Sequence, residues 1–414
     1  MYEDFPFDMR DVAVIAGLRI KHRGTVNWEV YCPFCNDEKG KMTLNMVKNV
    51  FRCNRCGESG GMLDLYGKLY RVDYGTACRE IKEALGKWTM RKDHAVQQKA
   101  VEKRIPEIPQ AEPASLAERN KTYSCLLSCL PLTESHLQNL IKRGFSKERV
   151  EQNGYKSTIP FGYRKIAERL LEQGCTLRGV PGFYQEENGA WTVNLNAKNA
   201  GFLVPVRDRN GLIAGMQIRL DHPYDGRKYI WLSSANYPSG ITSGSPVHFA
   251  GEKGQETVFA TEGPLKADLS HFLSGRTFVA VAGVNLYGNL PPVLKALKES
   301  GTRKIYEAYD MDKELGLVCG RDYKESTCTA CTFQETVYGS VECPKKAIKK
   351  RNIQRGCRNL YRLCREAGLE VISLTWDADK NGVWNGNIKG VDDYLYRLQE
   401  RELSESSGTA GLLN

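Results

Sequence analysis

The chain has 414 residues, of which 41% are hydrophobic and 26% are charged, so it can bury a sizeable core and does not have the composition of a disordered protein. A single core is unusual at this length, and we expect two or three domains. The 59 Lys and Arg residues outnumber the 49 Asp and Glu residues, and the net charge of +10 favours polyanionic partners; an ordinary solvated surface is the alternative.

The sequence gives no sign of export or of a membrane span. No apolar stretch approaches the roughly 18 residues needed to cross a bilayer. The opening residues MYEDFPFDMRDV lack the basic and then apolar layout of a signal peptide. We therefore expect a cytoplasmic protein without a membrane partner, in which the 14 cysteines are reduced and CxxC pairs bind metal more often than they form disulfides.

Four cysteines near the amino terminus have the spacing of a zinc ribbon. Cys32, Cys35, Cys53 and Cys56 form two CxxC pairs, each of which can direct two thiolates at one tetrahedral Zn²⁺ ion. The segments MTLNMV and VFRC alternate as strands do and predict a hairpin between the pairs. Four protein ligands leave no open position on zinc, which predicts a structural role. The expected template contacts of the hairpin are Lys41, Lys48, Arg52 and Arg55.

The sequence around these cysteines resembles the zinc-binding domain of DnaG-type bacterial and phage primases. The shared features are a CPxC pair, a strand hairpin, a CxxCG pair, a GG turn and a helix that begins with an apolar segment containing Asp64. Those domains usually present Cys-His-Cys-Cys, and here Cys35 stands where the histidine would be. A thiolate is also a competent zinc ligand, so the departure concerns the subtype and not the metal.

Residues 89–117 combine charge, Gln and Pro with little apolar periodicity and predict a flexible linker. Residues 118–250 then contain strand-like runs separated by the turns RDRNG and PYDGR, which predict an antiparallel sheet. This part resembles the first half of the DnaG-type RNA polymerase core. The resemblance implies that Arg219 and Lys228 hold the nucleoside triphosphate or the template, a task that suits cations because they neutralise phosphate charge.

Three apolar runs farther along the chain, ETVFATEG, TFVAVAG and KIYEAYDMD, alternate with helical stretches. This order predicts a parallel sheet, in which functional groups gather at the carboxyl ends of the strands. Glu262 follows the first run, and Asp310 and Asp312 follow the third. Alternation along a strand is expected to turn both aspartates to the same side, where they and Glu262 can share one hard cation, Mg²⁺ or Mn²⁺.

The elements TEGPLKA and DMD resemble the two acidic motifs of the Toprim fold, which DnaG-type primases share with topoisomerases and some nucleases. The resemblance implies that Glu262, Asp310 and Asp312 are catalytic and bind magnesium. Lys266 stands where primases of this type often carry another acid, and we group it with the nucleotide- or template-binding residues. Candidate replacement acids near the end of the chain are Asp377, Asp379, Asp392 and Asp393.

Residues 314–350 form an insertion rich in cysteine and basic residues. A second zinc site and spare reduced thiols are both compatible with its cysteines, because one pair alone has CxxC spacing. The cysteines are Cys319, Cys328, Cys331 and Cys343. The densest basic run of the chain follows and is an expected nucleic-acid contact. It contains Lys345, Lys346, Lys349, Lys350 and Arg351.

These observations predict a multidomain α+β and α/β protein. The expected parts are a zinc ribbon (1–88), a linker (89–117), a mixed α+β subdomain (118–250), a Toprim α/β domain with a parallel sheet (251–400) and a tail (401–414). The predicted function is DNA primase, making RNA primers on single-stranded DNA from nucleoside triphosphates for a phage, plasmid or integrative element. The absence of a Walker A motif implies that a helicase is supplied by a separate chain. The alternatives are a Toprim nuclease or topoisomerase-like enzyme and a non-catalytic DNA-binding replication factor.

Overall fold

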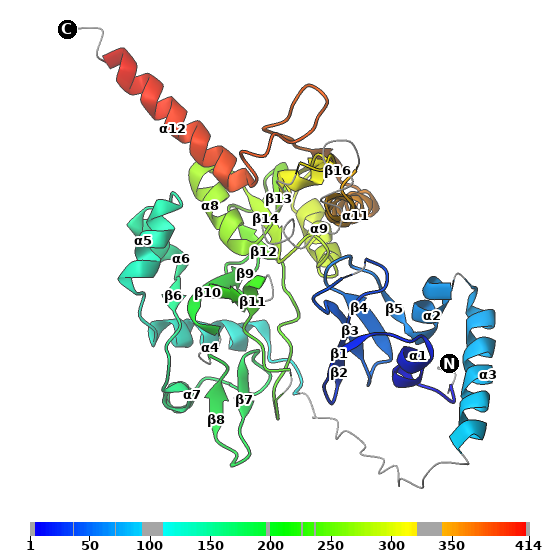
Figure 1. Ribbon diagram of the computed structural model, residues 1–414. Coiled ribbons are helices and arrows are strands. Elements are labelled where there is room, and N and C mark those ends of the chain that lie inside the picture. Colours follow the sequence, from blue (N-terminus) through cyan, green and yellow to red (C-terminus); the bar gives the residue numbers. More distant parts are fainter. Residues whose placement is uncertain are drawn as a thin grey trace. The chain divides into compact units, whose positions relative to one another are not determined.

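The computed structural model describes residues 5–35, 37–70, 72–92, 111–195, 199–224, 227–235, 237–320 and 342–410. The chain divides into two compact units, whose elements are labelled in Figure 1. The first unit comprises Met1–Glu107 and Leu317–Asn352, and the second comprises Ile108–Gly316 and Ile353–Asn414. Helix α11 (Pro344–Glu366) contributes residues to both units.

The described part of the first unit contains an antiparallel sheet in the order β1-β2-β3-β4-β5. Its strands are β1 (Ile20–Arg23), β2 (Asn27–Val30), β3 (Met42–Asn45), β4 (Val50–Cys53) and β5 (Ser59–Gly61). Its amino-terminal helices are α1 (Met9–Ile15), α2 (Met62–Tyr70) and α3 (Tyr74–Lys92). The predicted hairpin is confirmed, since Met42 pairs with Cys53 and Asn45 with Val50. The hairpin returns the chain and so brings the second CxxC pair back beside the first.

The core of the first unit follows from alternation along its strands. In β3, Met42 and Leu44 are buried, whereas Thr43 and Asn45 are half-buried. Leu44 packs in one cluster with Phe51 of β4 and Leu65 of α2. One face of the sheet is therefore apolar and covered, and the same core contains the cysteines of the zinc ribbon.

The second unit combines helices with sheets of different type. Its helices are α4 (Leu116–Ser128), α5 (Glu134–Lys142), α6 (Lys147–Asn153), α7 (Tyr163–Glu172), α8 (Pro264–Ser274), α9 (Leu290–Glu299), α12 (Val391–Ala410) and the 3₁₀ helix η2 (Met311–Glu314). Its antiparallel strands are β6 (Lys156–Ser157), β7 (Phe183–Gln185), β8 (Trp191–Val193), β9 (Gly201–Arg207), β10 (Ile213–Tyr224) and β11 (Arg227–Trp231). The strands of its mixed sheet are β12 (His248–Ala250), β13 (Thr257–Glu262), β14 (Phe278–Val281), β15 (Lys304–Glu307) and β16 (Glu370–Ser373).

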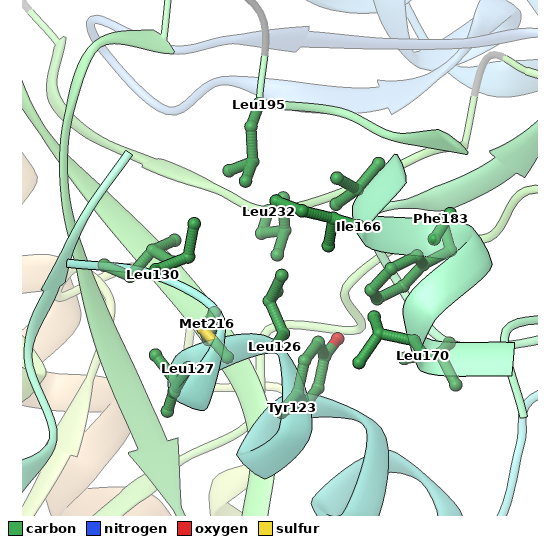
Figure 2. Close-up of a cluster of buried hydrophobic side chains, with 14 of the residues drawn as sticks. Tyr123, Leu126, Leu127, Leu130, Ile166, Leu170, Phe183, Leu195, Met216 and Leu232 are labelled. Carbon is green, nitrogen blue, oxygen red and sulfur yellow. The ribbon is translucent and has the colours of Figure 1, made fainter. Parts of the chain in front are cut away.

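The antiparallel sheet predicted for the middle of the chain is confirmed. Its order is β11-β10-β9-β6, and every neighbouring pair is antiparallel. One face packs against α4, and α7 packs against α4 and β8, so that Leu126 and Leu170 belong to the same buried cluster as Met216 and Leu232 (Figure 2). Burial of this apolar face, at roughly 25 cal/mol per Å², fixes the orientation of the sheet relative to the two helices.

The predicted parallel sheet is also confirmed, with one addition. The strand order is β12-β14-β13-β15-β16, in which β13 to β16 pair in parallel and β12 is an antiparallel edge. Glu262 is the last residue of β13, and β15 ends at Glu307. The carboxyl ends of these two neighbouring strands therefore lie side by side, which is where the predicted acids were expected to gather.

The antiparallel sheet and the mixed sheet share one cluster of buried side chains. Phe145 and Phe202 pack against Leu265 and Leu269 of α8. Polar contacts join the same elements, since Asp268 accepts hydrogen bonds from Tyr155 Oη (2.7 Å) and His248 Nε2 (2.9 Å). The shared core holds the middle region and the strand ends of the mixed sheet in one arrangement.

A buried ion pair fixes the turn that follows β15. Lys313 and Glu307 are both at most 2% exposed, and Lys313 Nζ lies 2.8 Å from Oε1 and 2.9 Å from Oε2 of Glu307. The same ammonium group donates to Leu374 O, just beyond β16, at 2.6 Å. The side chain of Lys313 therefore ties helix η2 back to two adjacent strand ends.

Among the described residues, no helix is both long and apolar enough to cross a membrane.

We expect Lys313→Met to destabilise the second unit by about 3 kcal/mol or more, because Glu307 is left buried without its counter-charge. Denaturant unfolding followed by far-UV circular dichroism measures this. The matched control is Lys295→Ala, which removes an exposed ion pair with Glu299 and should change stability by less than about 1 kcal/mol. Equal effects of the two substitutions would contradict the anchoring role of Lys313.

Candidate active site and metal centre

The zinc-ribbon cysteines converge as predicted. The four Sγ atoms of Cys32, Cys35, Cys53 and Cys56 lie within 4.8 Å of one another. The Sγ atoms of Cys32 and Cys56 are 3.7 Å apart, and those of Cys35 and Cys53 are 3.9 Å apart. A tetrahedral zinc ion with Zn–S bonds of about 2.3 Å requires sulfur atoms about 3.8 Å apart, so the four thiolates fit Zn²⁺.

The thiols also perturb one another in a way that a cation relieves. Contact with Cys32 raises the pKa of the Cys35 thiol, whereas contact with Cys32 lowers the pKa of the Cys53 thiol. Four sulfur atoms in one buried cluster cannot all be thiolates without a positive charge between them. Zinc supplies that charge, and coordination by four protein ligands makes its role structural.

The predicted acids of the mixed sheet also converge. Glu262 ends β13, Asp310 caps the amino end of η2, and Asp312 lies within η2. The carboxyl groups of Glu262 and Asp310 share a hydrogen bond. Asp310 and Asp312 are 5% and 1% exposed, so their carboxylates are removed from bulk water. Asp310 therefore lies against Glu262, and Asp312 follows two residues later in η2; we call these three residues the acidic cluster. Among the described residues, the four cysteines are the one group of metal-ligating side chains whose ligand atoms all lie within 4.8 Å of one another, and the three acids do not form such a group.

The reason why the two aspartates lie together differs from the prediction. Strand alternation does not place them, because β15 ends at Glu307 and Asp312 belongs to a 3₁₀ helix. The turn that places them is anchored by the buried pair of Lys313 with Glu307. The shared side of Asp310 and Asp312 thus results from a side-chain anchor and not from the two-residue period of a strand.

Two lysines supply positive charge to the acidic cluster. Lys266, on α8, forms an ion pair with Asp310 Oδ1. Lys389 Nζ lies 2.9 Å from Asp310 Oδ2 and 3.0 Å from Asp312 Oδ2, so its ammonium group bridges the two aspartates. The side chain of Lys266 is 17% exposed and that of Lys389 is 45% exposed. Lys266 was expected to bind nucleotide or template, and here its ammonium group lies against Asp310.

The charges of the cluster shift its titration. Burial and the neighbouring Asp310 carboxylate raise the pKa of Glu262 to about 8. Burial opposes ionisation of Asp310 as well, but the ammonium groups of Lys266 and Lys389 lower the pKa of Asp310 below its ordinary value. Asp310 is therefore the more acidic of the two carboxyl groups.

One of the four candidate replacement acids lies beside the cluster. Asp392 is 6% exposed, and burial raises its pKa to about 6 although the charge of Lys266 opposes the shift. Asp377 instead accepts hydrogen bonds from the backbone N–H groups of residues 387 and 388, and Asp379 accepts from those of residues 381 and 383. Asp393 accepts from Gly390 N at 3.4 Å. Three of the four acids thus have local backbone partners, and Asp392 adds a carboxyl group near Lys266.

One arginine, Arg143, interacts with Asp392, and a second, Arg219, lies near Arg143. Burial and the nearby guanidinium of Arg143 lower the pKa of Arg219, and the charge of Arg143 also acts on Asp392. Arg143 follows α5, and the next residue, Gly144, has a φ of 111° and leaves room for Tyr396 of α12. A Cβ at Gly144 would lie 2.6 Å from the Tyr396 ring, so glycine permits this close approach of α5 to α12.

The two residues predicted to hold nucleotide or template in the middle region do not lie on one face. Arg219 pairs with Phe202 and Tyr229 in the sheet, and its guanidinium lies over the Phe202 ring. Lys228 precedes Tyr229 on β11, so its side chain points to the opposite face. Arg219 therefore lies on the face of the sheet near Arg143, whereas Lys228 is exposed on the opposite face.

The cysteine-rich insertion is partly described. Cys319 and Cys343 are buried, and the backbone N–H of Cys343 donates to Leu317 O at 2.7 Å. Cys328 and Cys331 lie outside the described residues. Lys346 is 5% exposed and donates to Val318 O at 3.0 Å, so this member of the basic run holds the chain at the start of α11. The other members are half-exposed or exposed, and they are Lys345, Lys349, Lys350 and Arg351.

Sequence reasoning missed Lys389 and Arg143. Lys389 stands three residues before Asp392, and no spacing rule links a loop lysine to aspartates almost 80 residues earlier in the chain. Arg143 is the C-cap residue of α5, and nothing in its sequence context distinguishes it from other basic residues at helix ends. The positive net charge was the one available signal, and it does not single out a residue.

We expect Cys35→His to retain one zinc ion per chain, because an imidazole is also a competent ligand at a tetrahedral site. Cys35→Ala should lose the zinc and the folded ribbon, since apparent binding energies of structural zinc reach about 10 kcal/mol and are coupled to folding. Metal content by atomic emission and thermal unfolding measure both. Cys78→Ala, in α3 of the same unit, is the control and should keep its zinc. Retention of zinc by Cys35→Ala would contradict the ligand assignment.

The amino-terminal part of the chain matches a known protein family. Residues 7–98 match the family model of the CHC2 zinc finger, the zinc ribbon of DnaG. A comparison with curated proteins gave no match.

Among solved structures, the chain is similar to the zinc-binding and RNA polymerase domains of the Aquifex aeolicus primase, with 15% identity, a TM-score of 0.46, and coverage of 97% of this chain and 82% of that chain. It is also similar to the RNA polymerase domain of Mycobacterium tuberculosis primase DnaG in complex with double-stranded DNA, with 15% identity, a TM-score of 0.37, and coverage of 58% and 80%. A DNA primase domain from Pseudomonas aeruginosa gives 14% identity, a TM-score of 0.35, and coverage of 64% and 68%. The family match and the four converging cysteines together make residues 7–98 a CHC2 zinc finger domain.

Proposed function

We propose that the chain is a DNA primase of the DnaG type, which makes short RNA primers on single-stranded DNA by magnesium-dependent nucleotidyl transfer. The observation that carries the proposal is the contact of Glu262 with Asp310 near neighbouring strand ends, with Asp312 two residues after Asp310, in η2. The CHC2 zinc finger at residues 7–98 supports it, because it joins a primase-type zinc ribbon to this acidic cluster in one chain.

The acidic cluster has the chemistry of a divalent metal site. Among the described residues, the ammonium groups of Lys266 and Lys389 face four carboxyl groups, those of Glu262, Asp310, Asp312 and Asp392. Carboxyl groups therefore outnumber ammonium groups, and burial together with the charge of Asp310 raises the pKa of Glu262. Carboxylate oxygens suit Mg²⁺, which needs few protein ligands, so we assign Glu262, Asp310 and Asp312 as its ligands.

The magnesium ion supplies charge neutralisation at the phosphates of an incoming nucleotide and activation of the attacking hydroxyl group. The residues of the chain supply the remaining functions. Arg143 and Arg219 lower the cost of placing a triphosphate beside the carboxylates, because two neighbouring guanidinium groups are each relieved by an anion. The pKa of Glu262 is raised, and a bound divalent cation would lower it and so favour the third carboxylate.

The wider context of the proposal rests on the resemblances of the sequence. We assign the mixed sheet with its acids to a Toprim domain at residues 251–400, preceded by the polymerase-core subdomain at 118–250. We further propose that a separate helicase chain delivers the single-stranded template, that the host is a phage, plasmid or integrative element, and that the protein acts in the cytoplasm. A second zinc ion bound by Cys319, Cys328, Cys331 and Cys343 is part of the same proposal.

We expect the intact protein to convert nucleoside triphosphates into labelled oligonucleotides on single-stranded DNA with Mg²⁺. Asp310→Asn should reduce synthesis about 100-fold or more, because removing one ligand charge forfeits several kcal/mol of transition-state stabilisation. The measurement is label incorporation resolved by denaturing gel electrophoresis over a panel of templates.

The matched control is Asp379→Asn, an identical substitution at an exposed turn, which should stay within about twofold of wild type. Circular DNA incubated with Mg²⁺ provides a second readout. Nicking or relaxation that requires Asp310, without primer synthesis, would replace the primase by a Toprim nuclease or topoisomerase-like enzyme. If wild type neither makes primers nor nicks or relaxes circular DNA, a non-catalytic DNA-binding factor would be favoured.

A further inference from the structure

The residue that bridges the two aspartates is a lysine, and the chain around it is built to hold it there. Lys389 Nζ contacts one oxygen of Asp310 and one of Asp312, at 2.9 and 3.0 Å. Its backbone is fixed as well, because Lys389 O accepts from the N–H of Met311, the residue between the two aspartates, at 2.9 Å. The ammonium group therefore lies where a cation can neutralise both carboxylates at once.

The segment that delivers Lys389 is organised by Asp377. The carboxylate of Asp377 accepts from the N–H of Asn387 and of Ile388, both at 2.8 Å. Ile388 O accepts in turn from the indole N–H groups of Trp376 (3.2 Å) and Trp384 (3.0 Å). These bonds close the loop directly before Lys389. Asp377, predicted as an accessory metal ligand, is thus a positioning residue for a lysine.

The two lysines of the cluster differ in how easily they can leave. Lys266 is 17% exposed and interacts with both Asp310 and Asp392, so moving it would leave a buried aspartate without a counter-charge. Lys389 is 45% exposed, and its four-carbon side chain can carry the ammonium group into water without disturbing the backbone bond to Met311.

We infer that Lys389 is an exchangeable counter-ion of the active site: its ammonium group holds the position between Asp310 and Asp312 and is displaced when a divalent cation binds there, whereas Lys266 remains as a permanent charge. This inference rests on the proposed function, because it assigns the acidic cluster to a catalytic metal. It has two consequences. Lys389 competes with the metal for the two carboxylates. When no metal is bound, its charge offsets the repulsion between Asp310 and Asp312.

The test is direct titration of the intact protein with Mn²⁺ in metal-depleted buffer, with free Mn²⁺ followed by electron paramagnetic resonance. Lys389→Met keeps the apolar stem and removes the charge, and it should tighten Mn²⁺ binding about tenfold, since a competing charge about 3 Å from both ligands is removed. Lys389→Arg retains the charge and should bind Mn²⁺ no more tightly than wild type. Lys380→Met, at an exposed lysine of the same loop, should change the affinity less than about twofold.

Asp310→Asn shows whether the titrated site is this cluster, and it should weaken binding in both the wild-type and the Lys389→Met backgrounds. Equal affinity of wild type and Lys389→Met would overturn the inference, as would weaker binding by Lys389→Met or affinities insensitive to Asp310→Asn. The readout does not depend on primer synthesis. Tighter Mn²⁺ binding by Lys389→Met without primers in any variant would leave the exchange intact and refute the proposed function.

Discussion

The arrangement of the acidic cluster depends on one buried ion pair, that of Lys313 with Glu307. Glu307 is the last residue of β15, and Lys313 lies in the 3₁₀ helix that follows. Because the two charges are almost fully buried, neither can be separated from the other without a cost of several kcal/mol. The pair folds the chain back on the strand end and so turns Asp310 and Asp312 to the same side.

A second constraint is charge balance around those aspartates. Carboxylates cannot be gathered at low exposure unless positive charge accompanies them. The chain provides it with Lys266 from α8 and Lys389 from the loop before α12, elements that lie far apart in the sequence. Burial raises the pKa of Glu262, whereas the two ammonium groups lower that of Asp310.

The sequence was sufficient to predict the features that depend on local spacing. The four zinc-ribbon cysteines, the hairpin between them and the parallel order of β13, β14 and β15 follow from short repeated patterns. Glu262 and Asp310 were found because the strand ends of a parallel sheet collect functional groups.

Features that depend on tertiary contacts could not be predicted in the same way. Asp392 could not be separated from Asp377 as a replacement acid, because their different partners arise from loop closure. Lys228 was grouped with Arg219, but the pairing of Arg219 with Tyr229 places the two side chains on opposite faces. Lys389 and Arg143 are single cations whose importance results from what they approach in space.

Diffraction from crystals of the intact protein soaked in Mn²⁺, recorded at the manganese absorption edge, is the most direct test of the central claim that Glu262, Asp310 and Asp312 together form a divalent metal site. The account predicts an anomalous peak in contact with the carboxylates of Asp310 and Asp312, with the Lys389 ammonium group moved away from them. A map without manganese there and with Lys389 still bridging the two aspartates, or with the peak at the loop of Asp377 and Asp379, would contradict it.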